Sequence, residues 1–244
     1  MNRRTFVARG ALAAIAAPCL AAHSVAGAEA AKSSDAAIRV AVVTGGHPYD
    51  VLSFHKLFRT LPGGDAYIQH MDDFTTTPEP VRDQYDVVLF YHMLMAGPPD
   101  GPVKATLEHL GATAQGVVVL HHALLAYPQW TVWSDLVGIG DRKFGFHYGQ
   151  TLQVQVAPRD HSITRGLVPW TMGDETYTMA DAGQGSEILL TVEHPKSMKT
   201  LAWARPFKKS RVLCFQSGHD NVTWANAGFR EVLRRGIRWC ARRT

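Results

Sequence analysis

The chain has 244 residues, of which 46% are hydrophobic and 19% charged, a composition that suits one α/β domain with a buried core and excludes a disordered chain. Its formal net charge of +4 includes Arg3, Arg4 and Arg9. Residues 1–28 hold these arginines and no acidic residue, so the remaining chain has a formal charge of only +1. This balance gives no electrostatic support to a nucleic-acid partner, and none is expected.

The first 28 residues carry the features of an export signal. Arg3-Arg4 precede an alanine-rich apolar run over residues 11–22, and Ala26-Gly27-Ala28 fits a cleavage site for small side chains. This order is typical of a twin-arginine signal peptide, so we expect a periplasmic or secreted protein. The run is too short and too weakly hydrophobic for stable membrane insertion, and an uncleaved tail is the alternative.

The chain therefore divides into a signal peptide (1–28), a polar linker (29–37) and a folded domain (38–244). In the first half of the domain, continuous apolar runs alternate with amphipathic segments, which predicts parallel strands joined by helices. Strands are expected at 38–44, 65–71, 86–92 and 117–121, and helices after Asp50 and over 102–110. Because such crossovers are right-handed, we expect an α/β fold with a doubly wound, mostly parallel sheet.

The second half of the domain has less regular patterning. Strands are expected at 153–156 and 187–192, a hairpin at 200–204 and 211–216, and an amphipathic helix at 224–241. Cys214 falls on a buried strand and Cys240 on the apolar face of that helix, which predicts two core thiols; a disulfide between them is the alternative. The arginines of the helix lie mostly off its apolar stripe and predict a solvated face.

Histidines stand at the carboxyl ends of three predicted strands: His47, the pair His121-His122, and His219. In open α/β sheets, ligands bind outside the carboxyl ends of the strands, so we expect these rings to converge on one site. Neutral imidazole is the commonest metal ligand in proteins. We therefore predict that His47, His122 and His219 hold a divalent metal, with zinc as the leading candidate. The alternative is that each histidine is hydrogen-bonded to the backbone and is structural.

Two other kinds of site are disfavoured by the sequence. Gly45-Gly46 lacks the spacing of a dinucleotide or phosphate loop, so no nucleotide cofactor is expected. Histidine occupies the turn after the central strand, where acyl-transfer enzymes place a serine or cysteine nucleophile. Acid–base chemistry remains, and we assign it to His122, Glu175 and Asp220.

Aromatic side chains near these positions suit the apolar faces of a sugar. The residues predicted to bind substrate are Tyr49, His121, Trp130 and Tyr177. A core position is the alternative for each aromatic ring.

Five separated motifs resemble the ThuA-like (trehalose utilisation) domains. They are Thr44-Gly45-Gly46-His47 with Tyr49, His121-His122-Ala123 with Trp130, Asp160 to Leu167, Asp174-Glu175-Thr176-Tyr177, and Gly218-His219-Asp220. The resemblance covers roughly Ile38 to Cys240 and implies a flavodoxin-like sheet similar to that of class I glutamine amidotransferases. It also implies that the chain is not a functional amidotransferase, because His121 or His122 stands near the position of the nucleophilic cysteine. Asp50 and Ser162 depart from the family pattern.

The resemblance implies a small-molecule sugar as partner and a role in disaccharide or keto-sugar metabolism. A non-catalytic carbohydrate-binding module on the same scaffold is the alternative. Glu175 stands at the matching glutamate of the motif. Because side chains alternate along an extended segment, we expect Glu175 to face the pocket near His219 and Asp174 to face solvent.

Overall fold

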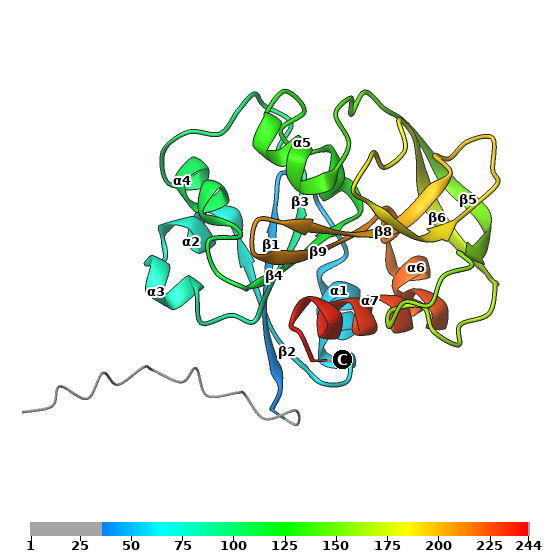
Figure 1. Ribbon diagram of the computed structural model, residues 1–244, viewed down its shortest axis with the longest axis horizontal. Helices are drawn as coiled ribbons and strands as arrows, with labels where there is room; N and C mark the ends of the chain where they lie inside the picture. The colour runs from blue at the N-terminus through cyan, green and yellow to red at the C-terminus, as the bar shows by residue number, and fades with distance from the viewer. Residues whose placement is uncertain (1–35, 244) are drawn as a thin grey trace, which may run out of the picture. The chain divides into compact units, whose positions relative to one another are not determined.

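The computed structural model describes residues 36–243; the predicted signal peptide lies outside the described residues. This part of the chain forms an α/β domain around one mixed sheet (Figure 1). The strands lie in the order β2 (Gly64–His70), β1 (Ile38–Gly45), β3 (Val87–His92), β4 (Gly116–Leu120), β9 (Ser210–Phe215), β8 (Thr200–Phe207), β7 (Glu187–Thr191), β5 (Gly145–Val156) and β6 (Trp170–Thr178).

The first five strands of this order pair in parallel, and the last four are antiparallel to their neighbours. The α/β class is as predicted, but the sheet is mixed rather than mostly parallel. One reason lies in the connection lengths. Only Lys208-Lys209 separate β8 from β9, and a parallel connection needs a dozen or more residues. A link this short forces an antiparallel hairpin.

Helices cover both faces of the parallel strands. On one face lie α1 (Val51–Arg59), α6 (Asn221–Ala225) and α7 (Ala227–Cys240); on the other lie α2 (Met71–Thr76), α4 (Gly101–His109), the 3₁₀ turn η1 (His121–Leu125) and α5 (Thr131–Val137). Alternate residues of β1, β3, β4 and β9 pack into the two cores, so that Val118 lies on the α7 side and Val119 on the α5 side. The middle of each of these four strands is therefore continuously apolar. None of the described helices is both long and apolar enough to cross a bilayer.

Several elements differ from the sequence-based expectation. The strand expected at 153–156 begins at Gly145, and β6 over 170–178 was not predicted as a strand. The short helices α2, α3 (Glu79–Arg82) and α5 were also not predicted. The expected C-terminal helix is divided at Asn226, whose side chain accepts a hydrogen bond from the Phe229 amide and caps α7. An asparagine that caps the first amides of a helix begins a new helix at that point, although the helical spacing of apolar residues continues across Asn226.

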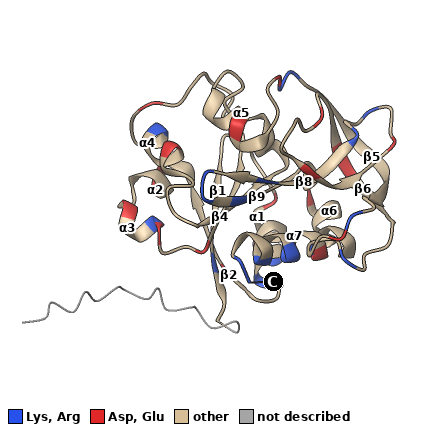
Figure 2. Ribbon diagram, in the orientation of Figure 1, with Lys and Arg blue, Asp and Glu red and all other residues tan. Residues whose placement is uncertain are grey.

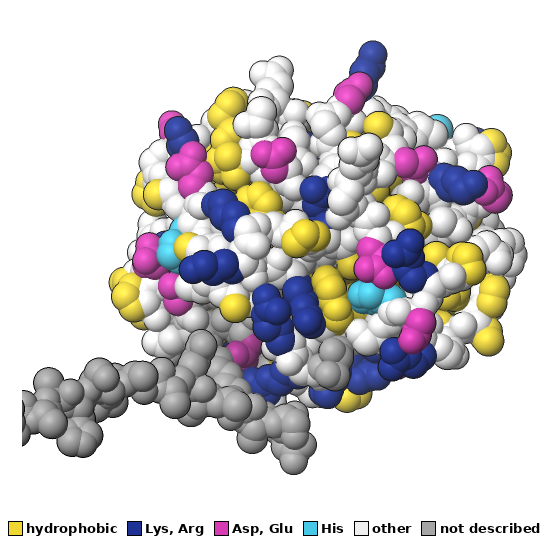
Figure 3. Space-filling view, in the orientation of Figure 1, with side chains coloured by type: hydrophobic (Ala, Val, Ile, Leu, Met, Phe, Trp, Pro, Cys, Tyr) yellow, Lys and Arg dark blue, Asp and Glu magenta, His cyan; other side chains and the backbone are white. Residues whose placement is uncertain are grey.

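The arginines of α7 make local contacts with the protein itself. Lys and Arg side chains gather over this helix (Figures 2 and 3). Arg234 and Arg235 both pair with Glu231, at 2.7 and 2.6 Å, and Arg230 donates to the main-chain oxygen of Thr60 at 3.0 Å. These bonds tie the helix to its surroundings, as expected for a solvated structural face.

Cys214 and Cys240 are both reduced and buried. Cys214 belongs to the core under α5, and Cys240 to the core under α7. Of the two alternatives left by the sequence, the structure therefore has the core thiols and no disulfide between them.

Candidate functional site

Residues from the carboxyl ends of β1, β4 and β9 meet at one edge of the sheet. The ring centroids of His47 and His122 lie 4.6 Å apart, those of His47 and His219 lie 6.3 Å apart, and those of His121 and His219 lie 5.4 Å apart. The histidines predicted to converge do so. The turn after β1 depends on Gly46, whose φ of +72° and close approach to the Met93 carbonyl leave no room for a side chain.

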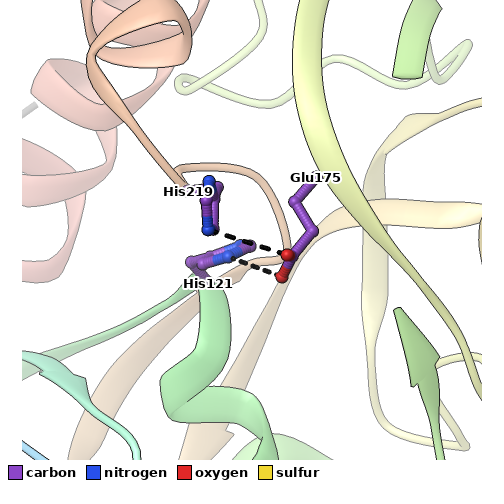
Figure 4. Close-up of side chains that lie close together, drawn as sticks. All are labelled: His121, Glu175 and His219. Carbon is purple, nitrogen blue, oxygen red and sulfur yellow. Dashed lines mark ion pairs between the residues drawn. The ribbon is translucent and has the colours of Figure 1, made fainter. Parts of the chain in front are cut away.

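The carboxylate of Glu175 on β6 faces two of these histidines, His121 and His219 (Figure 4). Its Oε1 is 3.5 Å from Nε2 of His121, and its Oε2 is 3.6 Å from Nε2 of His219. His121 is completely buried, whereas the side chain of His219 is 20% exposed. The carboxylate thus joins a buried imidazole to one that solvent reaches.

The orientation of the His121 ring is fixed at both nitrogens. Nδ1 lies 2.7 Å from the carbonyl oxygen of Gln216, which can only accept, so Nδ1 carries the proton. Nε2 lies 2.8 Å from the Tyr177 hydroxyl. Nε2 is therefore directed towards Tyr177 and Glu175. A protonated ring donates from Nε2 to the carboxylate, whereas a neutral ring presents its lone pair there, which is the arrangement that a metal-ligating histidine needs.

His121 also has an unusual backbone conformation. Its φ is +52°, in the left-handed region that residues with a Cβ rarely adopt. It stands at the sharp turn between β4 and η1, where acyl-transfer enzymes on related strand–turn–helix units carry their nucleophile. Strained positions of this kind cluster at functional sites, so the turn marks His121 as a candidate functional residue.

Asp174 is buried, which contradicts the expectation that it faces solvent. Its side chain accepts hydrogen bonds from the amides of Gly218 at 3.0 Å and His219 at 3.1 Å, and from the Thr223 hydroxyl at 2.8 Å. Although β6 is the last strand in the sheet order, the sheet curls so that this strand meets the loop after β9. Alternation does send Asp174 and Glu175 to opposite sides of β6, but protein covers both sides.

The two adjacent acids have opposite pKa shifts. Burial raises the pKa of Asp174 above its ordinary value, and the nearby His121 and the hydrogen bonds from Thr223 and the two amides offset this only in part. Burial also acts to raise the pKa of Glu175, but hydrogen bonding and charge from His121, with the charge of His219, outweigh it and lower that pKa. Glu175 is therefore the ionised carboxylate of the site at neutral pH.

Two further histidines at this edge are neutral. Burial lowers the pKa of His122 well below its ordinary value, and it lowers the pKa of His47 as well. Neither ring nitrogen of His122 has a hydrogen-bond partner, and Nδ1 of His47 has none. Buried polar atoms without partners are rare, so they indicate a place where substrate, water or an ion completes the bonding.

The arrangement fits a metal centre, but with different ligands from those predicted. One ligand atom each from His121, Glu175 and His219 lies within 4.8 Å of the others. Ligands about 2 Å from a tetrahedral zinc stand roughly 3.3 Å apart, close to the 3.5 and 3.6 Å seen here. Among the described residues, His47 and His122 belong to no such group of three, so only His219 is retained from the predicted ligands.

The other predicted site residues have varied positions. Tyr177 lies in the site, and Tyr49 lies next to it, 6.0 Å from the ring of Tyr91. Trp130 lies outside the site. It is 7% exposed and packs against Tyr127 in the core under α5, because burial in an apolar core stabilises a large aromatic ring. Asp220 caps α6, and its Oδ2 lies 3.3 Å from Nδ1 of His219.

Sequence reasoning missed three aromatic residues of the site. The Tyr91 hydroxyl donates to the main-chain oxygen of His219 at 3.0 Å, and its ring lies 4.2 Å from that of His122. Tyr148 of β5 lies 5.2 Å from the His219 ring, with Phe146 beside it at 5.3 Å. The spacing of Phe146 and Tyr148, two residues apart before a glycine, was the available signal for an exposed strand face.

Solved structures with the same fold are known. A ThuA-like protein from Parabacteroides merdae has a TM-score of 0.67 and 17% identity, covering 84% of this chain and 90% of that one. A second, from Bacteroides uniformis, has a TM-score of 0.65 and 17% identity, covering 86% and 94%. A GMP synthase protein from Thermoplasma acidophilum, at 12% identity and a TM-score of 0.51, covers 84% and 95%. At these identities the similarity shows the fold alone.

No curated protein matches the chain significantly. The sequence model of the family described as ThuA, trehalose utilisation, matches residues 39–240. This match spans every strand and helix at the site described above. The chain belongs to the ThuA (trehalose utilisation) family.

Proposed function

We propose that this chain is an enzyme that acts on a disaccharide or keto-sugar at the carboxyl edge of its parallel strands. We further propose that His121, Glu175 and His219 hold a divalent metal there, with zinc as the first candidate. The observation that carries the proposal is the Glu175 carboxylate, placed 3.5 and 3.6 Å from Nε2 of two histidines that follow different strands, β4 and β9. Membership of the trehalose utilisation family supports a sugar as the substrate.

Each residue of the site then has a distinct task. When bound, the metal would act as a Lewis acid towards a sugar oxygen. Gln216 and Tyr177 fix the ring of His121, and Asp220 orients that of His219. His47, neutral and partly exposed, would take a proton from a sugar hydroxyl group; its lowered pKa keeps the ring in the form that accepts protons at neutral pH.

Metal content and turnover test this proposal together. Untagged protein prepared without chelators should contain about one equivalent of a divalent transition metal. Glu175→Gln, which removes the charge at constant size, should lose the metal and the turnover of disaccharides and 3-keto-sugars. Glu193→Gln is the matched control, because Glu193 is exposed and forms an ion pair with Lys199, away from the histidines of the site.

The outcomes separate the two readings of the family resemblance. Metal and turnover in the wild type, both lost in Glu175→Gln, support the enzyme. If the protein binds sugars but forms no product with any of the metals and substrates tested, the chain is a carbohydrate-binding module. Wild-type metal content below about a tenth of an equivalent, unchanged after incubation with zinc, would contradict the metal centre.

We also propose that residues 1–28 direct export through the twin-arginine route. The support is the order of Arg3-Arg4, an apolar run and small residues at 26–28. Changing both arginines to lysine should leave the precursor in the cytoplasm, as measured by cell fractionation. Undiminished export of the double variant would contradict this route.

A further inference from the structure

The geometry points to a second sugar subsite on β5, formed by the rings of Phe146 and Tyr148. We infer that this pair holds the second ring of a two-ring sugar while the first ring lies at His219 and Glu175. The inference rests on the proposed function, because it names the substrate class of that site: a disaccharide or aryl glycoside rather than a free monosaccharide.

The two rings lie on the side of β5 that faces the site. Phe146 is directly opposite Tyr177 in the antiparallel pairing of β5 with β6, so both side chains project from the same face of the pair. Tyr177 uses that face to reach His121. Tyr148 is two residues after Phe146 and therefore shares the face with it. Its ring lies 5.2 Å from the ring of His219.

A β-bulge directs Tyr148 towards His219. The register between β5 and β6 shifts between His147 and Gln150, and Gly149 within it has a φ of +62°. A glycine in this conformation is typical of a bulge that bends a strand and turns a side chain, and such bulges are frequent beside active sites. The bulge at Gly149 thus places the ring of Tyr148 next to His219, the candidate metal ligand.

The exposure of the pair indicates a ligand rather than a core. Phe146 is 54% exposed and Tyr148 is 60% exposed, although their rings contact each other at 5.3 Å. Two large apolar faces left in water beside His219 and Asp220 combine stacking surface with hydrogen-bonding groups. A pyranose ring has the matching chemistry, since its C–H faces are apolar and its hydroxyl groups lie around its edge.

The position of the pair indicates the size of the substrate. Tyr148 lies beside His219, and Phe146 lies next to Tyr148. A monosaccharide bound at His219 and Glu175 lies against Tyr148 at one edge only and leaves Phe146 uncovered. A second ring attached to it extends over both aromatic rings. The pair therefore increases the affinity for two-ring sugars more than the affinity for one-ring sugars.

Binding of trehalose and of glucose to the full mature chain tests the inference, by calorimetric titration together with NMR of the aromatic protons. The wild type should bind trehalose about tenfold more tightly than glucose. Tyr148→Ala and Phe146→Ala should each lose most of that difference, measured as the ratio of the two affinities in the same variant. Tyr148→Phe should retain it. Tyr67→Ala is the control, because Tyr67 is also exposed, at 45%, but lies on β2.

Each result has a defined meaning. Equal affinities of the wild type for trehalose and glucose would overturn the subsite, as would trehalose binding that Tyr148→Ala leaves unchanged. A dimer that Tyr148→Ala dissociates without any change in trehalose affinity would assign the pair to a contact between copies. Loss of the preference in Tyr148→Ala with full metal content supports the subsite. If the wild type prefers trehalose to glucose but contains no metal and turns over no sugar, the result supports the subsite and contradicts the proposal that the chain is an enzyme.

Discussion

Asp174 holds the main chain of His219, accepting its amide proton at 3.1 Å and that of Gly218 at 3.0 Å. The two bonds go to different carboxylate oxygens. An asparagine has only one oxygen, so in either orientation its NH₂ group would face an amide N–H. Asp174 therefore positions the loop that carries His219 and does not itself contact the substrate side of Glu175.

Asp174→Asn should lower the free energy of unfolding by about 1–3 kcal/mol, the usual effect of an unsatisfied buried donor. Urea unfolding monitored by fluorescence measures it. Asp73→Asn, at an exposed position of α2, should change the free energy by less than about 0.5 kcal/mol. If the two variants were equally stable, the loop would not depend on the Asp174 carboxylate.

The left-handed turn at His121 makes a prediction about two substitutions at one position. His121→Gly and His121→Ala both remove the ring, and both should abolish metal binding. Only glycine adopts a φ of +52° without strain, so the glycine variant should be more stable than the alanine variant by about 1 kcal/mol. The comparison is made by urea unfolding of the two proteins. Equal stabilities would show that the turn relaxes and that the conformation stores no strain.

His92 predicts how stability depends on pH. Burial lowers its pKa to about 3, compared with 6.5 for an exposed histidine. The unfolded chain therefore binds a proton at His92 between these values while the folded chain does not, so stability is lost as the pH falls below 6.5. Between pH 7 and 4.5 this residue should remove about 2.5 kcal/mol of stability.

His92→Leu removes this titration. The change in unfolding free energy between pH 7 and 4.5 should therefore be about 2.5 kcal/mol smaller in the variant than in the wild type. The same pH dependence in both proteins would show that His92 is protonated in the folded state. Other buried histidines, such as His122, keep their own contribution in both proteins, so the difference isolates His92.

Zinc should stabilise the wild type and not the ligand variants. A ligand that binds only the folded state adds about 2.7 kcal/mol at a hundredfold excess over its dissociation constant. We expect a higher Tm with zinc for the wild type and for Glu193→Gln, and no increase for Glu175→Gln or His219→Ala. An equal increase in Glu175→Gln would place the zinc elsewhere on the chain.

The part of the site on parallel strands could be predicted from the sequence. Residues 40–43 and 117–120 are continuous apolar runs. A run of this kind predicts both a buried strand and the edge of the sheet at which the histidine that follows the strand must lie. The convergence of His47, His122 and His219 followed from that rule alone. It needed only the direction of each strand, which sequence order and connection length provide.

The antiparallel half could not be predicted in the same way. Asp174 is buried because the sheet curls and brings the amides of Gly218 and His219 to it from 44 and 45 residues away. No local pattern contains that contact. The first half of β5 was missed because its large side chains, Phe146 and Tyr148, face solvent rather than a core, so apolar alternation there does not indicate burial. The proposed ligand set depends on this half, since Glu175 belongs to β6.

The placement of Cys214 and Cys240 has a consequence for how the protein matures. Each thiol lies in a different core, with the sheet between them, and burial raises the pKa of both; that of Cys240 reaches about 12. Burial thus disfavours the thiolate that an oxidant needs, and the two thiols lie in separate cores without a bridge between them. The domain therefore reaches its final form without oxidative folding. A protein that folds in a reducing compartment and then crosses into an oxidising one, as proposed above, would form no disulfide between these two cysteines on the way.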